Sequence, residues 1–550
     1  MRPQQFAEAS CDSDGRSQLH ITKENTDASN LASCLHLEIK SLNIESTQKP
    51  AQSHSDLAGV QNKLAVHRVL HDLPVEILCK IFDTAIHDTD PGTSRDLAVV
   101  EAILALYRRL CSLTSVCSHW RRICLSTGSF WSLIPILRRK GDGPPMDMCL
   151  ERAGDSKLHL VGEVGVLDPQ VVEVITQYGP RIQTLDISGV RHNARKIVAS
   201  VLKHSNSGGI ANLSVRDYQA CYRRDRFEQS RNLFSPDSSE YTLFSRFADS
   251  LNVLRLCGFN LNWTQVHFSR LVELRLEEVA LEDKAMATNM LLAVASAPEL
   301  RRLQLSRMEV RQDITRENQS DQPISLPVSL RELQSLCLRD IHRDLLPFLL
   351  QSINPGSYQT LVGFTQPSSF YSQSSNFGNA WEDILQIQAL ELKGFNIDTL
   401  MISGNWLSGS KFYDMLWAVP TITSLCIRGH SFNKRALRAL IRLPESGKGG
   451  GNEHFPTIRR LHILDADFDL TALDELKEVV KSHGVQELRL GRLLVPLPSS
   501  REDNMVRFEH PEDGLYTKPI EDWLRATVPN FTVARRMKDI PDSEFWMDIW

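Results

Sequence analysis

A short motif, xxLxL, recurs along the chain from about residue 155 onward, usually with another apolar residue three positions before its first leucine. Successive first leucines lie between 20 and 41 residues apart. One unit of this size cannot bury its own apolar side, so the units are expected to stack and share one continuous core. The first leucines of the stronger and weaker copies are Leu158, Leu185, Leu213, Leu254, Leu274, Leu303, Leu336, Leu361, Leu390, Leu425, Leu461 and Leu488.

The segments between the motifs often show helical periodicity, for example residues 285–295 and 470–480. Each unit is therefore predicted to be a short parallel strand that returns through a helix or an irregular stretch. Periods of about 20–30 residues are typical of leucine-rich repeats, and longer gaps indicate insertions. We predict an α/β fold in which residues 155–495 form an irregular leucine-rich-repeat solenoid, since the asparagine ladder of the standard repeat is missing.

The side chain between the two leucines of each motif is expected on the concave strand face of the solenoid. Such a face is an extended binding surface in repeat proteins. Its chemistry here is too mixed to indicate one ligand, and each residue taken alone is more often a solvated strand residue. The candidates are Arg255, Arg275, Gln304, Cys337, Glu391, Cys426, His462 and Arg489.

A different periodicity precedes the repeats. Apolar residues from 73 to 86 fall on one face of a helix, with Pro74 in the first turn, where its missing N–H costs nothing. A loop at residues 88–96 follows, and a second amphipathic helix is predicted over residues 110–124. We therefore predict a separate helical domain over residues 63–140.

Three segments of this domain resemble the F-box family. They are Leu73-Pro74-Val75-Glu76-Ile77-Leu78 with Ile81-Phe82, then Val116-Cys117-Ser118-His119-Trp120-Arg121, and finally Phe130-Trp131. The usual form of the family is LPxEIL…IF, a VCxxWR segment and a closing tryptophan, and this chain has all three in order. The stretch from Phe82 to Leu110 is longer than in a minimal F-box, which implies an inserted loop or a longer helix.

F-box proteins dock on the Skp-type adaptor of SCF ubiquitin ligases, reach a cullin through it, and present protein substrates for ubiquitination. The resemblance implies adaptor contacts by Leu73, Pro74, Ile77, Leu78 and Ile81, and a domain core built by Phe82, Val116, Trp120 and Trp131. The alternative is that all of them are simply the core of a small helical bundle. We favour that alternative for Trp120, and an interface for Leu73 and Pro74 at the exposed end of the first helix.

The two ends of the chain differ from its middle. Residues 1–62 are rich in Ser, Gln, Asn, Asp and Thr, so they bury too little apolar area to offset their ordering entropy and are predicted to be largely disordered. The motif stops after about residue 496, yet residues 496–550 are predicted to cap the last repeat because they are rich in aromatic residues. These are Trp523, Phe531, Phe545, Trp546 and Trp550.

Charge and cysteine usage limit the partners and the compartment. A formal net charge of −5 gives no general attraction to nucleic acid or to an anionic membrane. The eleven cysteines include no CxxC pair and lie mostly in apolar segments, which predicts reduced thiols in a cytoplasmic or nuclear protein. We also find no signal sequence and no uninterrupted apolar stretch of about 18 residues.

Signatures of catalysis and of cofactor binding are missing. The sequence has no GxSxG, GxGxxG or HExxH motif, and Cys111, Cys117, His119 and Cys124 are spaced so that a helix scatters them, which argues against zinc. We expect no cofactor and no catalytic activity of the chain itself. Two functions remain: a substrate-recognition subunit of an SCF ligase, or a ligase-independent repeat protein that acts as a scaffold or inhibitor. The sequence does not identify the substrate.

Overall fold

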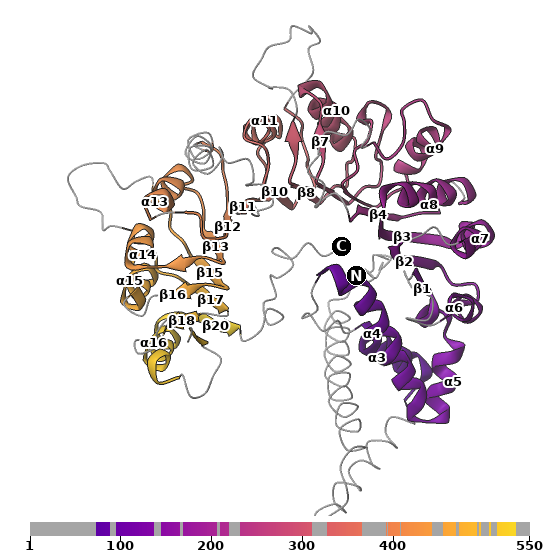
Figure 1. Cartoon of the computed structure of the whole chain (residues 1–550), viewed down its shortest axis with the longest axis horizontal. Helices are drawn as coiled ribbons and strands as arrows, with labels where there is room; N and C mark the ends of the chain where they lie inside the picture. The colour runs from indigo at the N-terminus through magenta and orange to yellow at the C-terminus, as the bar shows by residue number, and fades with distance from the viewer. Residues whose placement is uncertain are drawn as a thin grey trace, which may run out of the picture. The chain divides into compact units, whose positions relative to one another are not determined.

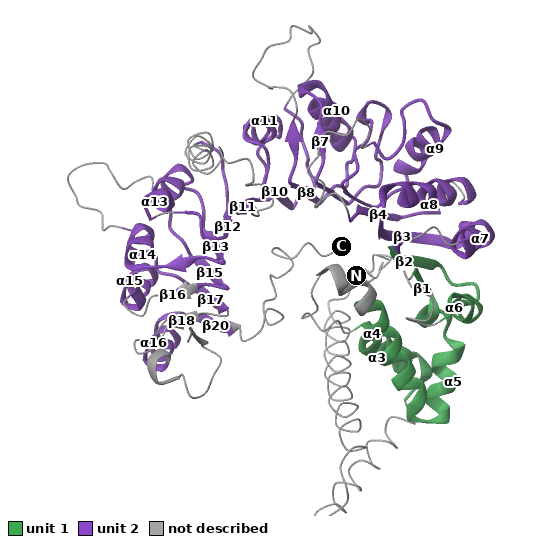
Figure 2. Cartoon of the chain, viewed as in Figure 1, with its two compact units in different colours: residues 1–163 green, residues 164–550 purple. Residues whose placement is uncertain are grey.

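The computed structural model divides into two compact units, with the boundary between Glu163 and Val164 (Figure 2). Residues 1–62, which the sequence predicts to be disordered, lie outside the described part of the chain. The structure describes residues 73–87, 95–136, 145–165, 169–205, 209–218, 232–310, 327–365, 392, 394–407, 409–442, 455–468, 472–491, 494–496, 505–507 and 514–534.

Unit 1 begins with three helices and continues with a small α/β element. The helices are α3 (Val75–His87), α4 (Arg95–Val116) and α5 (Ser118–Ser126), followed by the short 3-10 helix η1 (Gly128–Trp131). Two parallel strands, β1 (Leu133–Ile136) and β2 (Leu158–Val164), flank helix α6 (Met146–Ala153). Gly128 allows η1 to approach α6, because a Cβ there would lie 2.6 Å from the backbone oxygen of Ala153.

The predicted second helix is in fact two helices, which meet at Cys117. This residue has an extended backbone (φ −157°, ψ 169°), and its Sγ accepts the backbone N–H of Trp120 at 3.4 Å, so it caps the start of α5. The Arg121 Nε donates to the carbonyl of Thr114 at 3.0 Å and satisfies one open carbonyl at the end of α4. Helical periodicity missed this break because both helices place their apolar residues toward one core.

Unit 2 consists of parallel strands joined by helices, as predicted. The hydrogen-bonded order of the main strands follows their order in the chain, and the described helices from α7 to α15 lie on one side of them (Figure 1). These strands are β3 (Ile182–Gly189), β4 (Asn212–Asp217), β5 (Val253–Cys257), β6 (Glu273–Glu277), β8 (Arg302–Ser306), β10 (Ser335–Arg339), β11 (Gln359–Thr365), β12 (Thr399–Ser403), β13 (Ser424–Arg428), β15 (Arg460–Leu464), β17 (Glu487–Gly491) and β20 (Asn530–Ala534).

Helices and minor strands make up the rest of each repeat. The helices are α7 (Pro169–Tyr178), α8 (Arg191–His204), α9 (Ser239–Ala248), α10 (Lys284–Ala295), α11 (Leu345–Ser352), α13 (Gly409–Ala418), α14 (Lys434–Leu440), α15 (Leu473–His483) and α16 (Gly514–Thr527), with 3-10 turns η2 (Gly179–Arg181) and η3 (Trp263–Gln265). The minor strands are β7 (Ala280–Leu281), β9 (Glu309–Val310), β14 (Ser431–Phe432), β16 (Asp467–Phe468), β18 (Leu494–Pro496) and β19 (Met505–Arg507).

The leucines of the motif stack in register, which confirms the repeat prediction. From β3 to β10 one row of directly paired residues runs Leu185, Leu213, Leu254, Leu274, Leu303, Leu336. A second row runs from β12 to β17 as Leu400, Leu425, Leu461, Leu488. Every member of both rows is at most 1% exposed. Burial of this kind contributes about 1.5–3 kcal/mol for each leucine side chain, so the rows add substantially to the stability of unit 2.

The two rows are offset at β11, where the weak copies of the motif misled the sequence analysis. Thr360 pairs with Leu336, whereas Val362 pairs with Leu400, so the register shifts by two residues across this strand. Leu361 therefore points away from the leucine rows. The next described strand is Thr399–Ser403, and Leu390, which the sequence analysis assigned to the stack, lies outside the described residues.

A left-handed residue follows most strands and takes the place of an asparagine ladder. Its N–H donates to the carbonyl of the next strand over 2.7 to 3.1 Å, which extends the parallel ladder by one residue. Glycine tolerates this conformation, but other residues are strained in it by about 1–2 kcal/mol. The residues, with φ between 48° and 98°, are Gly258, Glu278, Arg307, Asp340, Gly404, Gly429 and Asp465.

The α/β pattern continues beyond residue 496, where the sequence placed the end of the repeats. After α16, strand β20 pairs with β17 in parallel, and Phe531 occupies the position of the stacked leucines beside Leu488. Lys481 lies 5.5 Å above the ring of Trp523, a second contact between this segment and the preceding repeat. Phe545, Trp546 and Trp550 lie outside the described residues.

Replacing a stacked leucine should cost far more than replacing its exposed neighbour. Leu303→Ala empties a fully buried site in the middle of the row and should lower the free energy of unfolding by about 2–5 kcal/mol. Arg302→Ala removes an adjacent side chain that is 67% exposed and should change the free energy of unfolding by less than about 0.5 kcal/mol. Urea denaturation followed by circular dichroism measures both, and equal effects would contradict the buried row.

Acid should weaken unit 2 through His483. The Nδ1 of this buried ring accepts the backbone N–H of Ile458 at 3.2 Å, and Nε2 lies 2.6 Å from the carbonyl of Leu440, to which it donates. The bond that Nδ1 accepts requires a neutral ring, and burial lowers the pKa of His483 below its usual 6.5. The unfolded chain therefore binds the proton more readily, so stability is complete above pH 6.5 and falls as the pH drops through 6.5 toward the lower folded pKa.

The test compares the wild type with His483→Gln in urea at pH 7.5 and pH 5.5. The stability advantage of the wild type should shrink at pH 5.5, by at most about 1.4 kcal/mol for each unit of pKa shift. Other titrating groups cancel in this difference. An advantage that is the same at both pH values would show that His483 does not titrate on unfolding.

Candidate functional site

The first turn of α3 presents apolar side chains to solvent. Val75 is 48% exposed and Ile77 is 38% exposed, Pro74 is exposed, and Leu73 is half-buried. The helix begins at Val75, one residue after Pro74, whose carbonyl accepts the N–H groups of Ile77 and Leu78 at 3.0 and 3.1 Å. Leu73 and Pro74 therefore precede the helix instead of lying within it.

The opposite face of α3 is core. Leu78 and Ile81 are 0% and 2% exposed, and Phe82 is fully buried beside them. Leu78 and Ile81 therefore belong to the core of the domain in this structure, and their contact with a partner stays a prediction. In a helix, residues three and four apart share a face, so the core face and the exposed first turn are distinct surfaces of one helix.

The core beneath this turn is aromatic. Trp120 is 4% exposed, and its ring centroid lies 4.7 Å from that of Phe82. Trp131 is 1% exposed, donates from Nε1 to the carbonyl of Cys124 at 2.8 Å, and is covered by the Arg152 guanidinium at 4.4 Å.

Val116, which was also predicted as core, is 38% exposed because it ends α4 where the chain turns into the cap of α5. Its place in the core is taken by Tyr107, which the sequence analysis left out. That residue is 3% exposed, and its hydroxyl donates to the carbonyl of Leu133.

A second exposed apolar side chain of this domain is Leu125, in the last turn of α5, which is 37% exposed. The Sγ of Cys79 in α3 and the Oγ1 of Thr127, which follows α5, are 3.6 Å apart, so the two helices meet there. We call Pro74, Val75, Ile77 and Leu125 the α3–α5 edge. Sequence periodicity missed Val75 and Leu125 because it identifies core faces and not exposed ends.

A second candidate surface is the face of the unit 2 sheet that carries none of the described helices. It is formed by the first, third and fifth residues of each strand, and we call it the helix-free face. Arg255, Arg275, Gln304, His462 and Arg489 lie on it as predicted; Glu391 lies outside the described residues. The predicted residues do not form one cluster, because Arg255 to Gln304 lie on β5 to β8, whereas His462 and Arg489 lie on β15 and β17.

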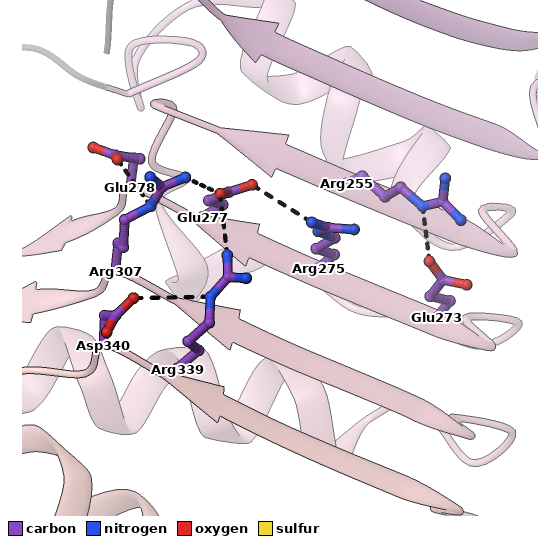
Figure 3. Close-up of polar contacts among 8 residues, drawn as sticks. All are labelled: Arg255, Glu273, Arg275, Glu277, Glu278, Arg307, Arg339 and Asp340. Carbon is purple, nitrogen blue, oxygen red and sulfur yellow. Dashed lines mark hydrogen bonds and ion pairs between the residues drawn. The ribbon is translucent and has the colours of Figure 1, made fainter. Parts of the chain in front are cut away.

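Between β5 and β10 this face carries a network of ion pairs (Figure 3). Glu277 is 1% exposed and lies at its centre, 3.7 Å from Arg275, 3.6 Å from Arg339 and in contact with Arg307. The Nε of Arg255 on β5 contacts the carboxylate of Glu273, the first residue of β6, at 2.7 Å. The sequence analysis missed the glutamates and Arg339 because it considered only the residue between the two leucines of each motif. Residues two positions before and after that one lie on the same face of a strand.

The strained turn residues take part in this network. Arg307 contacts Glu278 at 3.0 Å, and both have left-handed backbones. Arg339 lies 3.8 Å from Asp340, another left-handed residue, and burial raises the pKa of the Asp340 carboxyl. Burial also raises the pKa of Asp186, farther along the face, to about 6. The network is therefore largely self-neutralised and buried, and it holds the strand ends together.

From β11 onward the helix-free face carries apolar side chains among its charged ones. Leu361, Met401, Cys426 and Leu464 form one buried cluster, with Cys337 packed against it. Of these, the sequence analysis identified Cys337 and Cys426 on the face but not their apolar neighbours. The helix-free face thus offers a charged part and, on later strands, an apolar cluster.

Comparison with known proteins bears on the helical part of unit 1. Residues 70–134 match the model of the family described as F-box-like, which is 65 of the 550 residues. Residues 70–134 are therefore an F-box-like domain. The match includes the α3–α5 edge and the aromatic core beneath it, and it supports an F-box protein. None of the curated proteins matches the chain significantly.

Three further properties concern the described residues only. None of their helices is long and apolar enough to cross a membrane. Their cysteines form no disulfide. No group of three or more His, Cys, Asp or Glu residues among them is arranged to hold a metal ion.

Truncating Trp120 should open the F-box core. Trp120→Ala removes the ring that packs on Phe82 and should lower the local stability of α3 and α5 by about 3–5 kcal/mol. Leu125→Ala, at an exposed position of the same helix, should cost less than about 0.5 kcal/mol. Amide hydrogen exchange of the full chain measures the protection of α3 in each variant. Unchanged protection in Trp120→Ala would contradict the core role.

Proposed function

We propose that this protein is the substrate-recognition subunit of an SCF-type ubiquitin ligase, in which the F-box-like domain binds a Skp-type adaptor and thereby a cullin. An F-box-like domain suggests an SCF-type adaptor role in general. The observation that carries the proposal for this chain is the α3–α5 edge, where Val75, Ile77 and Leu125 are each more than a third exposed. Exposed apolar side chains that gather in one place are typical of a protein-binding surface.

The helix-free face of unit 2 is the proposed binding surface for the protein to be ubiquitinated. Its strands carry successive rows of side chains, and such rows suit an extended protein segment better than a small ligand. We assign the chain no catalytic step: it would hold the substrate while other subunits transfer ubiquitin. The same proposal places it in the cytoplasm or the nucleus, where that machinery operates.

The adaptor assignment predicts that a charge at Ile77 abolishes binding. Ile77 lies in the first turn of α3, where an aspartate suits the helix dipole and stays solvated in the free protein. In the complex the same carboxylate would be buried without a partner, at a cost of about 3–5 kcal/mol. The affinity of Ile77→Asp for the purified Skp-type adaptor should therefore fall at least about 100-fold, measured by isothermal titration calorimetry.

The matched control is Leu292→Asp, since Leu292 is also 38% exposed but lies on α10 in unit 2. It should bind the adaptor like the wild type. Leu73→Asp combined with Pro74→Ala tests the two residues before α3 and should also abolish binding of the adaptor. Equal binding by Ile77→Asp and the wild type would reject this interface. A wild type that does not bind the adaptor would favour the ligase-independent scaffold.

A further inference from the structure

Three chemically matched side chains lie on successive strands of the helix-free face. Cys426 on β13 and His462 on β15 are direct partners in the strand register, and Glu487 lies on the next strand, β17. The Sγ of Cys426 is 3.6 Å from Nδ1 of His462, and Nε2 of His462 is 3.4 Å from Oε1 of Glu487. The order is thiol, imidazole, carboxylate.

This order sets the direction of proton movement. With its proton on Nε2, facing the carboxylate, His462 presents the lone pair of Nδ1 to the thiol. Transfer of the thiol proton to Nδ1 would produce a thiolate beside an imidazolium, and Glu487 would stabilise the imidazolium. A thiol activated by a base that a third group orients is the usual arrangement of a nucleophilic cysteine. Arg489 contacts Oε1 of Glu487 at 2.7 Å and fixes the carboxylate in place.

The surroundings determine which reagent the thiol would meet. Met401 and Leu464 pack with Cys426 in the buried apolar cluster, and Cys426 is 7% exposed. The other charged side chains on this face of β13 and β15 are Arg428, which pairs with Asp465 at 2.9 Å, and Arg460. A small reagent with an apolar body and a polarised double bond fits this environment better than a charged one.

We infer that Cys426, His462 and Glu487 form a reactive-thiol site that takes soft carbon electrophiles of the α,β-unsaturated carbonyl class. Cys426 gives its proton to His462 and its sulfur attacks the β-carbon. A carbon–sulfur bond forms, the carbon–carbon π bond breaks, and the α-carbon takes the proton from the imidazolium. The thiol adds across the double bond, so no oxidant, reductant or leaving group is needed. The site does not depend on the proposed ligase function.

The test uses the folded full-length chain and N-ethylmaleimide, an α,β-unsaturated imide. Short labelling at pH 6.5 and pH 8.0, followed by digestion and mass spectrometry, gives the adduct rate at each cysteine. A short peptide with one ordinary cysteine serves as the reference, and its rate should fall roughly 25-fold between these pH values, following a thiol pKa of about 8.5. Cys426 should lose less than about fivefold, because its proton acceptor is built into the site.

Two variants separate activation from mere accessibility. His462→Gln should slow Cys426 at pH 6.5 by at least about tenfold and restore the steep pH dependence, and Glu487→Gln should shift both in the same direction by less. Exposed Cys111 should react at unchanged rates in every variant, and Cys149, which is 0% exposed with a pKa raised by burial, should stay unlabelled in all of them. Circular dichroism confirms that each variant is folded.

The inference is overturned if Cys426 in the native protein stays unlabelled after Cys111 has reacted completely. It is also overturned if Cys426 follows the pH dependence of the peptide, or if both variants keep the wild-type rate and profile. If His462→Gln does not fold, Glu487→Gln alone decides the matter, because its side chain is 23% exposed and tolerates an isosteric change.

Discussion

Unit 2 depends on the registered contact between leucines on adjacent strands. Each parallel strand contributes two apolar residues to the helix side of the sheet, and each pair is covered only when the next strand is in place. A slip of one residue would turn all of these side chains to the other face. The offset at β11 shows how the constraint is met when a repeat departs from the motif: the strand shifts by two residues, so the alternation of faces is kept.

The turn that ends each strand links this core to the surface. A left-handed residue is needed there to continue the backbone ladder, and three successive repeats use Glu278, Arg307 and Asp340 instead of glycine. All three residues form ion pairs within the network around Glu277. The charged part of the helix-free face is therefore built by the turns as well as by the strands. A partner of this face would meet arginines that are already oriented by buried carboxylates.

The strongest periodic patterns predicted the fold, but they did not predict the position or role of several single residues. The stacked leucines could be read from the sequence because burial of every copy imposes the same pattern. Strand β12 was missed although Leu400 and Ile402 have the same LxI spacing as Leu425 and Ile427, because Leu390 was assigned to this repeat instead. The break at Cys117 was hidden because α4 and α5 face one core. The pairing of Cys426 with His462 depends on register between strands 36 residues apart, which no local pattern reports.

The same reasoning limits where an adaptor can be recognised on the F-box-like domain. A residue serves either the internal core or a partner, and burial decides which. Leu78 and Ile81 already fill the core with Phe82, so moving them to an interface would open a cavity beneath Trp120. Exposed apolar side chains lie in the first turn of α3, at Val116 at the end of α4 and at Leu125 near the end of α5. The proposed recognition surface is the first of these, the short segment before and within the first turn of α3, where the LPxE motif lies.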